Sequence, residues 1–378
     1  MFIPYGRQTI DDEDISAVVE VLKSDYLTTG PKIEEFEKVV AEYVGAKYAV
    51  AISNGTAALH AACAAAGIQS GDEVITSPIT FVASANCVLY CGGTPVFADI
   101  DSETYNISLE DIRRKITNKT KAIIPVHYAG QPCNMDAIHK IAEEHNLIVI
   151  EDGAHALGAE YKGKRIGGLS DMTTFSFHPV KHITTGEGGM ITTNNVQLYE
   201  KLKLFRSHGI TRDEGMMRKK EGDWYYEQLS LGYNYRITDI QCALGISQMK
   251  KLDGFLKRRK EIVMGYQEAF KGMENIIVPT VAEGCESSWH LYVIQVKNCQ
   301  RKKVFDSLRD AGIGVNVHYI PVYKQPYYQE NGYKEVKCVQ AEQLYQQMIS
   351  IPLYPGLTNE QQDCVIEKVI NAVKFNEI

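Results

Sequence analysis

The sequence contains no long apolar run, no excess of positive charge and no paired cysteines. None of its 378 residues lie in an apolar run of the roughly 18 residues that a membrane-spanning helix needs, so we expect no membrane span. The formal net charge of −7 argues against a nucleic-acid partner, which requires a basic surface. The nine cysteines are scattered and form no C-x-x-C pair. With no signal peptide pattern at the first residues, they predict reduced thiols and a cytoplasmic protein.

Two nucleotide-binding motifs are present only in part. Residues 158–165 (G-A-E-Y-K-G-K-R) match a phosphate-binding P-loop until Arg165, which replaces the Ser or Thr that holds magnesium. No helix pattern follows, so we expect a hairpin there. Gly312-Ile313-Gly314 lacks the third glycine of a dinucleotide fingerprint, which disfavours a nicotinamide dehydrogenase.

A metal site is also disfavoured. His178 and His182 have the i, i+4 spacing of a helical metal pair, but Pro179 between them breaks such a helix. We therefore interpret both as loop histidines and predict no metal.

The length and the alternation of patterns predict the fold class. The chain is long enough for a large domain, placed at residues 1–252, and a smaller one at 253–378. A hydrophobic content of 44% and a charged content of 23% are typical of a soluble globular protein. Strand and helix patterns alternate between residues 48 and 150, which predicts an α/β fold with a mostly parallel sheet between helices. In the smaller domain we expect strands at 291–296 and 315–317 and helices at 302–311, 339–348 and 359–375.

The stretch Thr173–Gly189 carries the strongest chemical signal. Its strand pattern ends at His178-Pro179, because proline lacks the N–H that a central strand donates. Lys181 therefore lies on a turn just after a buried strand. A lysine desolvated in this way is a nucleophilic amine of the kind that forms Schiff bases. Taken alone, however, a lysine is more often a solvated surface charge.

Three other groups fall at predicted strand ends, where ligands of such sheets bind. Asn54-Gly55-Thr56 joins a strand to an alanine-rich helix, an arrangement that binds phosphates but also describes an ordinary helix cap. Asp152 ends an apolar strand and needs a donor or cationic partner there, unless it only caps a turn. Phe81 offers an aromatic face. Together with Lys181, these groups match the needs of a pyridine-ring phosphate ester.

Seven stretches resemble the DegT/DnrJ/EryC1/StrS family of sugar-nucleotide aminotransferases, across essentially the whole chain. They are L-T-T-G-P at 27–31, S-N-G-T-A-A-L at 53–59, S-P-I-T-F-V-A-S-A-N at 77–86, E-D-G-A-H-A at 151–156, F-S-F-H-P-V-K at 175–181, G-E-G-G at 186–189 and G-Y-N-Y-R-I-T-D at 232–239. The resemblance implies the aspartate-aminotransferase fold (fold type I) with a seven-stranded sheet. It also implies the cofactor pyridoxal 5′-phosphate.

The resemblance assigns roles residue by residue. It implies that Lys181 is the Schiff-base lysine, that Asp152 pairs with the ring nitrogen, and that His155 contacts the ring face or the phenolic oxygen. The other implied cofactor ligands are Gly55, Thr56 and Ala57 at the helix start, Phe81 on the ring, Ser176, and Asn234. The substrate-binding candidates by family position are Tyr5, Thr28, Gly30, Arg236, His318 and Tyr319.

Asn234 carries an expectation about assembly. It follows a charged, glycine-punctuated excursion at residues 209–232. The resemblance implies that Asn234 reaches the cofactor phosphate of a second copy, so that the active unit is a homodimer with shared active sites. A solvated loop within one subunit is the alternative.

Within the family, F-H-P-V-K-H-I-T-T-G-E-G-G at 177–189 is most similar to the subgroup that acts in pseudaminic acid synthesis, and S-H-G-I at 207–210 and V-H-Y-I-P-V-Y at 317–323 agree. This similarity implies transfer of an amino group from L-glutamate, which leaves as 2-oxoglutarate, to C4 of a UDP-linked 2-acetamido-2,6-dideoxy-4-keto-hexose.

The alternatives are an aminotransferase for another 4-keto or 3-keto sugar nucleotide, a pyridoxal-phosphate sugar dehydratase and a non-catalytic binding protein. Dehydratases of the family have histidine in place of the lysine, and a binding protein needs no proton shuttle, so Lys181 and Asp152 disfavour both.

Overall fold

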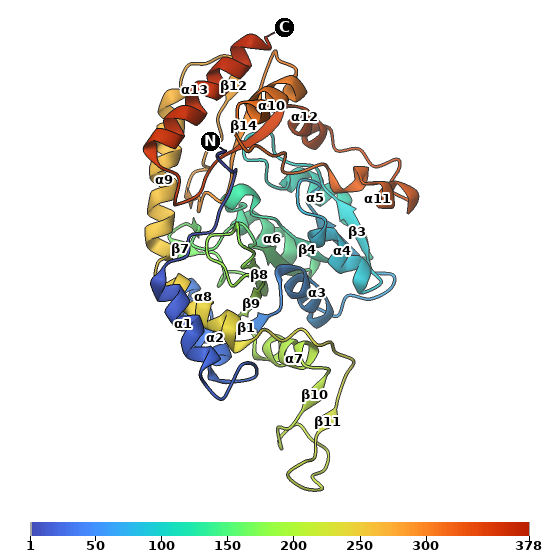
Figure 1. Ribbon diagram of the computed structural model, residues 1–378. Coiled ribbons are helices and arrows are strands. Elements are labelled where there is room, and N and C mark those ends of the chain that lie inside the picture. Colours follow the sequence, from blue (N-terminus) through green and yellow to red (C-terminus); the bar gives the residue numbers. More distant parts are fainter. Residues whose placement is uncertain (1, 378) are drawn as a thin grey trace.

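The computed structural model describes residues 2–377 and is built around one seven-stranded sheet (Figure 1). Its strand order is β1-β9-β8-β5-β4-β2-β3, and β9 alone is antiparallel to its neighbours. The predicted mostly parallel, seven-stranded sheet is therefore confirmed. The strands are β1 (Tyr48–Ile52), β2 (Glu73–Thr76), β3 (Thr94–Phe97), β4 (Thr120–Ile124), β5 (Ile148–Asp152), β8 (Met172–Ser176) and β9 (Gly189–Thr193).

Helices cover both faces of this sheet, because successive strand residues point to opposite sides. In β1, Ala49 and Ala51 pack into one apolar cluster while Val50 and Ile52 pack into the other. The first cluster is covered by α2 (Pro31–Val44), α5 (Leu109–Lys115), α6 (Met135–His145) and α8 (Asp239–Met249), with α1 (Asp12–Leu22) outside α8. The second is covered by α3 (Gly55–Ala65), α4 (Ala83–Tyr90) and α7 (Val196–Arg206).

The C-terminal part has an apolar core of its own, formed on a three-stranded sheet of order β12-β14-β15. Ile3 of the N-terminal segment also packs into this core. The elements are α9 (Leu252–Ala269), β12 (Ile276–Ile277), β14 (Tyr292–Val296), α10 (Arg301–Asp310), η2 (Val322–Lys324), α11 (Pro326–Glu330), α12 (Val339–Gln347), β15 (Met348–Ile351) and α13 (Asn359–Phe375). We propose that the smaller domain begins with α9.

One prediction for this part is wrong, and one strand was not predicted. Residues 315–317 do not form a strand, since Asn316 makes only an isolated bridge to Ser350. The helix predicted at 339–348 is confirmed as α12, which ends at Gln347, but the sequence analysis missed the strand that follows it, β15, which pairs with β14. The short run Met348–Ile351 is fully buried, and its strand conformation comes from pairing with a segment distant in sequence.

The excursion at residues 209–232 is a protruding arm. Figure 1 shows it extending away from the body of the molecule beyond α7, held by the short pair β10 (Ile210–Thr211) and β11 (Glu227–Gln228). Trp224 and Leu231 in the arm have 73% and 78% of their surface exposed, which is unusual for large apolar side chains.

Three other expectations can be compared with the structure. Residues 160–165 form the predicted hairpin, β6 (Glu160–Tyr161) with β7 (Lys164–Arg165), and β13 (Cys285–Glu286) adds to its edge. All nine cysteines are free thiols. Within residues 2–377, no helix is long and apolar enough to cross a membrane, and no cluster of His, Cys, Asp or Glu is arranged to hold a metal ion.

Candidate active site

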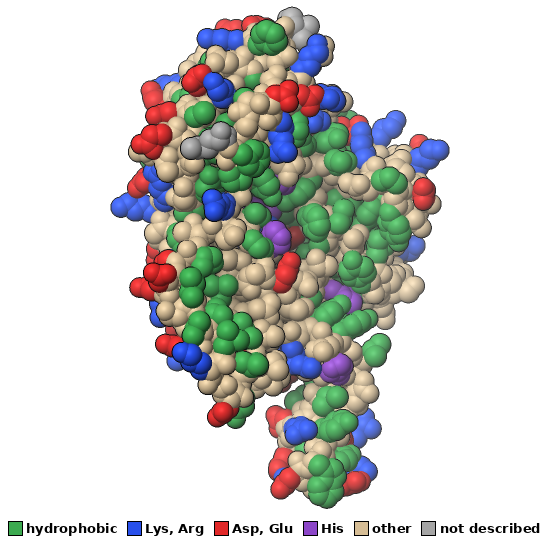
Figure 2. Space-filling view, in the orientation of Figure 1, with side chains coloured by type: hydrophobic (Ala, Val, Ile, Leu, Met, Phe, Trp, Pro, Cys, Tyr) green, Lys and Arg blue, Asp and Glu red, His purple; other side chains and the backbone are tan. Residues whose placement is uncertain are grey.

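A cavity of about 810 Å³ lies beyond the carboxyl ends of β1, β5 and β8, and the 316–319 segment of the smaller domain forms its other wall. Figure 2 shows histidine side chains within a hollow on this face of the molecule. Eleven of the predicted site residues line this one cavity: Tyr5, Gly55, Thr56, Ala57, Phe81, Asp152, His155, Ser176, Lys181, His318 and Tyr319.

Lys181 lies on the predicted turn after β8. Its backbone N–H donates to the carbonyl of His178 at 2.9 Å, which closes the turn that Pro179 begins. Burial lowers the pKa of the Lys181 ammonium to about 8, against a smaller opposing effect of the Asp152 carboxylate. A substantial fraction of the amine is thus neutral near pH 8, and the neutral amine is the nucleophilic form.

Asp152 is buried at the end of β5, with two donors in place. The hydroxyl of Ser84 donates to Oδ2 at 2.6 Å, and the backbone N–H of Ala154 donates to Oδ1 at 3.1 Å. Asp152 therefore does hold a turn, as the alternative interpretation proposed. Asp152 also lines the cavity, so it can contact a bound molecule in addition to holding the turn.

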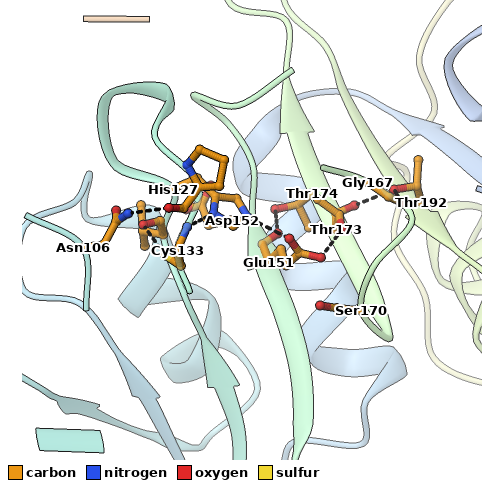
Figure 3. Close-up of polar contacts among 12 residues, drawn as sticks. Asn106, His127, Cys133, Glu151, Asp152, Gly167, Ser170, Thr173, Thr174 and Thr192 are labelled. Atoms are coloured by element: carbon orange, nitrogen blue, oxygen red, sulfur yellow. Dashed lines mark hydrogen bonds and ion pairs between the residues drawn. The ribbon is translucent and has the colours of Figure 1, made fainter. Parts of the chain in front are cut away.

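Behind Asp152, a fully buried polar network fixes the end of β5 (Figure 3). His127 Nδ1 accepts the backbone N–H of Cys133 at 3.0 Å, so its proton is on Nε2, which donates to Glu151 Oε2 at 2.7 Å. Thr173 donates to the other carboxylate oxygen at 3.1 Å. Burial raises the pKa of Glu151, but the hydrogen bond from His127, together with those from Ser170 and Thr173, outweighs it and the net shift is downward. Because side chains alternate along a strand, Glu151 and Asp152 face opposite sides, and only Asp152 reaches the cavity.

The start of α3 forms a place for an anion. Asn54 caps the helix by accepting the N–H of Ala57 at 2.8 Å, so both interpretations of this turn hold together. Gly55 is required there, because a Cβ on it would lie 2.9 Å from the Cβ of Ser176. The helix start, with its N–H groups and positive dipole end, therefore lies in close contact with Ser176, whose hydroxyl also lines the cavity.

An aromatic wall closes the cavity on the side of the smaller domain. His155 Nε2 lies 3.1 Å from the hydroxyl of Tyr319, whose ring is 6.3 Å from that of Phe81. Burial holds the pKa of His155 well below its usual value, with smaller contributions from Lys181 and two other histidines, so its imidazole is neutral. Burial likewise lowers the pKa of His318 to about 4. Tyr5 packs on His318 with ring centroids 5.2 Å apart.

Four predicted site residues lie elsewhere in this subunit. Thr28 bridges to Thr238, and Asn234 is exposed and bridges to Ser207. Gly30 and Arg236 line a second cavity, of about 680 Å³, between α2 and α7. One chain by itself does not bring these residues to Lys181.

The cavity also contains residues that the sequence analysis missed. Among them are Ser84, Glu187, Tyr235, His290 and Asn316, and also His178, which we had interpreted only as a loop histidine. Ser84 lies inside the 77–86 stretch, three residues after Phe81. Residues with this spacing lie on the same side of a helix, so the sequence could have placed Ser84 next to the cavity with Phe81.

The residues present fit pyridoxal 5′-phosphate. The start of α3 beside the Ser176 hydroxyl suits a phosphate, the buried carboxylate of Asp152 suits a ring nitrogen, and the low-pKa amine of Lys181 suits an aldehyde. The Nδ1 of His155 is buried with no hydrogen-bond partner among the described residues. Because burial holds the pKa of His155 well below its usual value, its ring presents no charge to the cavity.

Comparisons with known proteins agree with this geometry. Three curated relatives match nearly the whole chain. An uncharacterized protein of Methanocaldococcus jannaschii is 48% identical over 99% of this chain and 97% of its own. The spore coat polysaccharide biosynthesis protein SpsC of Bacillus subtilis is 45% identical over 99% of this chain and 97% of its own. The UDP-4-amino-4,6-dideoxy-N-acetyl-beta-L-altrosamine transaminase of Campylobacter jejuni is 41% identical over 93% of this chain and 92% of its own.

Solved structures show the same fold. The aminotransferase PseC of Helicobacter pylori, described as involved in the biosynthesis of pseudoaminic acid, superposes with a TM-score of 0.93 at 35% identity, covering 99% of this chain and 100% of its own. The putative sugar aminotransferase Spr1654 of Streptococcus pneumoniae, in its PLP-form, gives a TM-score of 0.94 at 32% identity and covers 99% of both chains. The family model for DegT/DnrJ/EryC1/StrS aminotransferases matches residues 8–370. The chain therefore belongs to the DegT/DnrJ/EryC1/StrS aminotransferase family, whose members depend on pyridoxal 5′-phosphate.

Proposed function

We propose that this protein is a nucleotide-sugar aminotransferase that moves the amino group of L-glutamate to C4 of a UDP-linked 2-acetamido-2,6-dideoxy-4-keto-hexose. The observation that carries the aminotransferase activity is the single cavity in which Lys181 and Asp152 lie beyond one sheet edge, next to the anion site at Gly55. The acceptor is supported by the 177–189 sequence, by the Campylobacter jejuni relative and by PseC.

The residues divide the work as follows. Bound pyridoxal phosphate would carry the amino group between the two substrates and withdraw electrons from the carbon that loses its proton. Thr56 and Ser176 would hold its phosphate, Asp152 its ring nitrogen and Phe81 its ring face. Lys181 Nζ takes the α-proton of glutamate as general base and, after 2-oxoglutarate leaves, delivers a proton to C4 of the sugar as general acid. A pKa near 8 suits both tasks, since an acid–base group works best near the operating pH.

A second acceptor remains a specific candidate. SpsC, 45% identical, takes part by its name in the synthesis of a spore coat polysaccharide. This relative supports the alternative that the protein aminates another 4-keto or 3-keto sugar nucleotide.

A panel of acceptors tests the proposal. Purified enzyme with glutamate is expected to turn over the UDP-linked 2-acetamido-4-keto-6-deoxy sugar with the highest kcat/KM among UDP-, GDP- and dTDP-linked keto-sugars. Preference for another keto-sugar would select the second candidate. If none of the keto-sugars were aminated, the result would contradict both candidate functions.

We also propose that the active unit is a homodimer with shared sites. Among the described residues that line the cavity, Lys181 is the one lysine or arginine, while Asp152 and Glu187 are acidic. The cofactor and both substrates carry phosphates or carboxylates, so further cations are needed. Arg236 and the amide of Asn234, on the segment that follows the arm, are suited to reach across from a second copy, and an arginine–phosphate contact can be bidentate.

Mixed protomers test the shared site. We expect Lys181→Ala and Asn234→Asp each to be inactive alone, and the mixture to regain activity. In a hybrid dimer one site carries both lesions and the other carries neither. With subunit exchange verified by differently tagged protomers, no recovered activity would mean that each chain holds a complete site; mixing either variant with itself is the control.

A further inference from the structure

The Asp152 carboxylate is joined to a short chain of buried hydroxyls that the proposed function has not used. Thr80 and Ser84 are both buried, and their hydroxyl oxygens lie 2.7 Å apart. Ser84 lies 2.6 Å from Asp152 Oδ2. Thr80 and Phe81 lie on the loop before α4, and Ser84 lies in its first turn.

The direction of donation along this chain follows from the groups. An ionised carboxylate only accepts, so the Ser84 hydroxyl donates to Asp152. The competing acceptor, the carbonyl oxygen of Phe81, is farther away at 3.4 Å. Because the Ser84 proton is donated to Asp152, the Ser84 oxygen accepts a hydrogen bond from the Thr80 hydroxyl. Each donation polarises the next, so the chain strengthens the bond that reaches the carboxylate.

We propose that Ser84, supported by Thr80, is a positioning residue that keeps the shared proton on the cofactor's ring nitrogen rather than on Asp152. This inference rests on the proposed function. A hydrogen bond to the charged form of an acid favours that form. With Ser84 donating, Asp152 stays a carboxylate that accepts from the ring nitrogen, and a protonated ring is the stronger electron sink. Without it, the carboxylate competes better for the proton.

Ser84 also restrains the orientation of the Asp152 carboxylate. The backbone N–H of Ala154 occupies Oδ1 and the Ser84 hydroxyl occupies Oδ2. With both oxygens bound from different sides, the carboxylate plane cannot rotate freely. The carboxylate is therefore held in one orientation at the wall of the cavity that Asp152 lines.

The test observes the proton directly. Enzyme is loaded with pyridoxal phosphate labelled with ¹⁵N in the ring, and the nitrogen chemical shift is measured by NMR in wild type, Ser84→Ala, Ser84→Cys and Thr80→Val. Wild type is expected at the protonated position and Ser84→Ala displaced toward the unprotonated one, with kcat lower by about tenfold, the size expected for one hydrogen bond to a charged group. Ser84→Cys, a weaker donor, and Thr80→Val are expected to lie between.

Thr76→Val is the matched control for Thr80→Val. Thr76 is also buried, and its hydroxyl donates to the carbonyl of Ile124 at 2.9 Å without touching Asp152. It is expected to leave the nitrogen shift at the wild-type position. If Ser84→Ala does not fold, Thr80→Val against Thr76→Val still decides. A wild-type shift in every Ser84 and Thr80 variant overturns the inference, as does an equal displacement in Thr76→Val. Failure of wild type to bind the cofactor would instead contradict the proposed function.

Discussion

Lys181→Ala is expected to abolish turnover while leaving cofactor binding intact. The variant loses the amine that attaches the aldehyde and the base that moves the substrate proton. One acid–base group contributes up to about 10⁴-fold, so kcat is expected to fall by at least that factor. The phosphate site at Gly55 and Ser176 and the carboxylate of Asp152 remain. The measurement is kcat with glutamate and a keto-sugar, beside the Kd of pyridoxal phosphate.

Two further observations separate this role from a structural one. Borohydride reduction of wild type followed by peptide mass mapping is expected to leave the pyridoxyl group on Lys181, and an adduct on another lysine would refute the assignment. In cofactor-free protein, acylation of Lys181 is expected to titrate near pH 8, because burial lowers its pKa to about 8. Lys302→Ala, which removes a highly exposed lysine on α10, is the control and should retain full activity.

Asp152→Asn is expected to fold normally and to lose most of its activity. An amide cannot keep a proton on the ring nitrogen, so the ring becomes a weak electron sink. Leaving one partner of a buried ion pair unpaired costs about 3–5 kcal/mol, which corresponds to a fall in kcat of roughly 10² to 5 × 10³-fold. The measurement is kcat together with the thermal unfolding temperature.

The same variant decides between the two roles of Asp152. An asparagine oxygen still accepts the N–H of Ala154, so a residue that only holds the turn would tolerate the change. Near wild-type kcat would therefore reduce Asp152 to a turn residue. Asp101→Asn is the matched control, because Asp101 accepts the N–H of Thr104 at 2.8 Å in an exposed turn, and we expect no loss of activity there.

The sequence by itself determined the residues that carry the chemistry. Pro179 ends the strand before Lys181 because it has no N–H, and Asp152 stands out because a carboxylate at the end of an apolar strand needs a partner. Both signals depend only on neighbours in the chain. The alternation of strand and helix patterns likewise fixed the parallel sheet, and with it the edge at which these residues meet.

Tertiary structure alone decided the features that depend on distant partners. Residues Met348–Ile351 became a strand because β14 offers pairing, although the preceding pattern is helical. The sequence analysis gave Ser84 and Thr80 no role, because only folding brings Asp152, 68 positions away from Ser84, within 2.6 Å of the Ser84 hydroxyl. Burial in the folded chain lowers the pKa of the His155 imidazole, which is therefore neutral, and also lowers the pKa of the Lys181 ammonium. Burial and long-range pairing are properties of the whole packed chain, so no local pattern contains them.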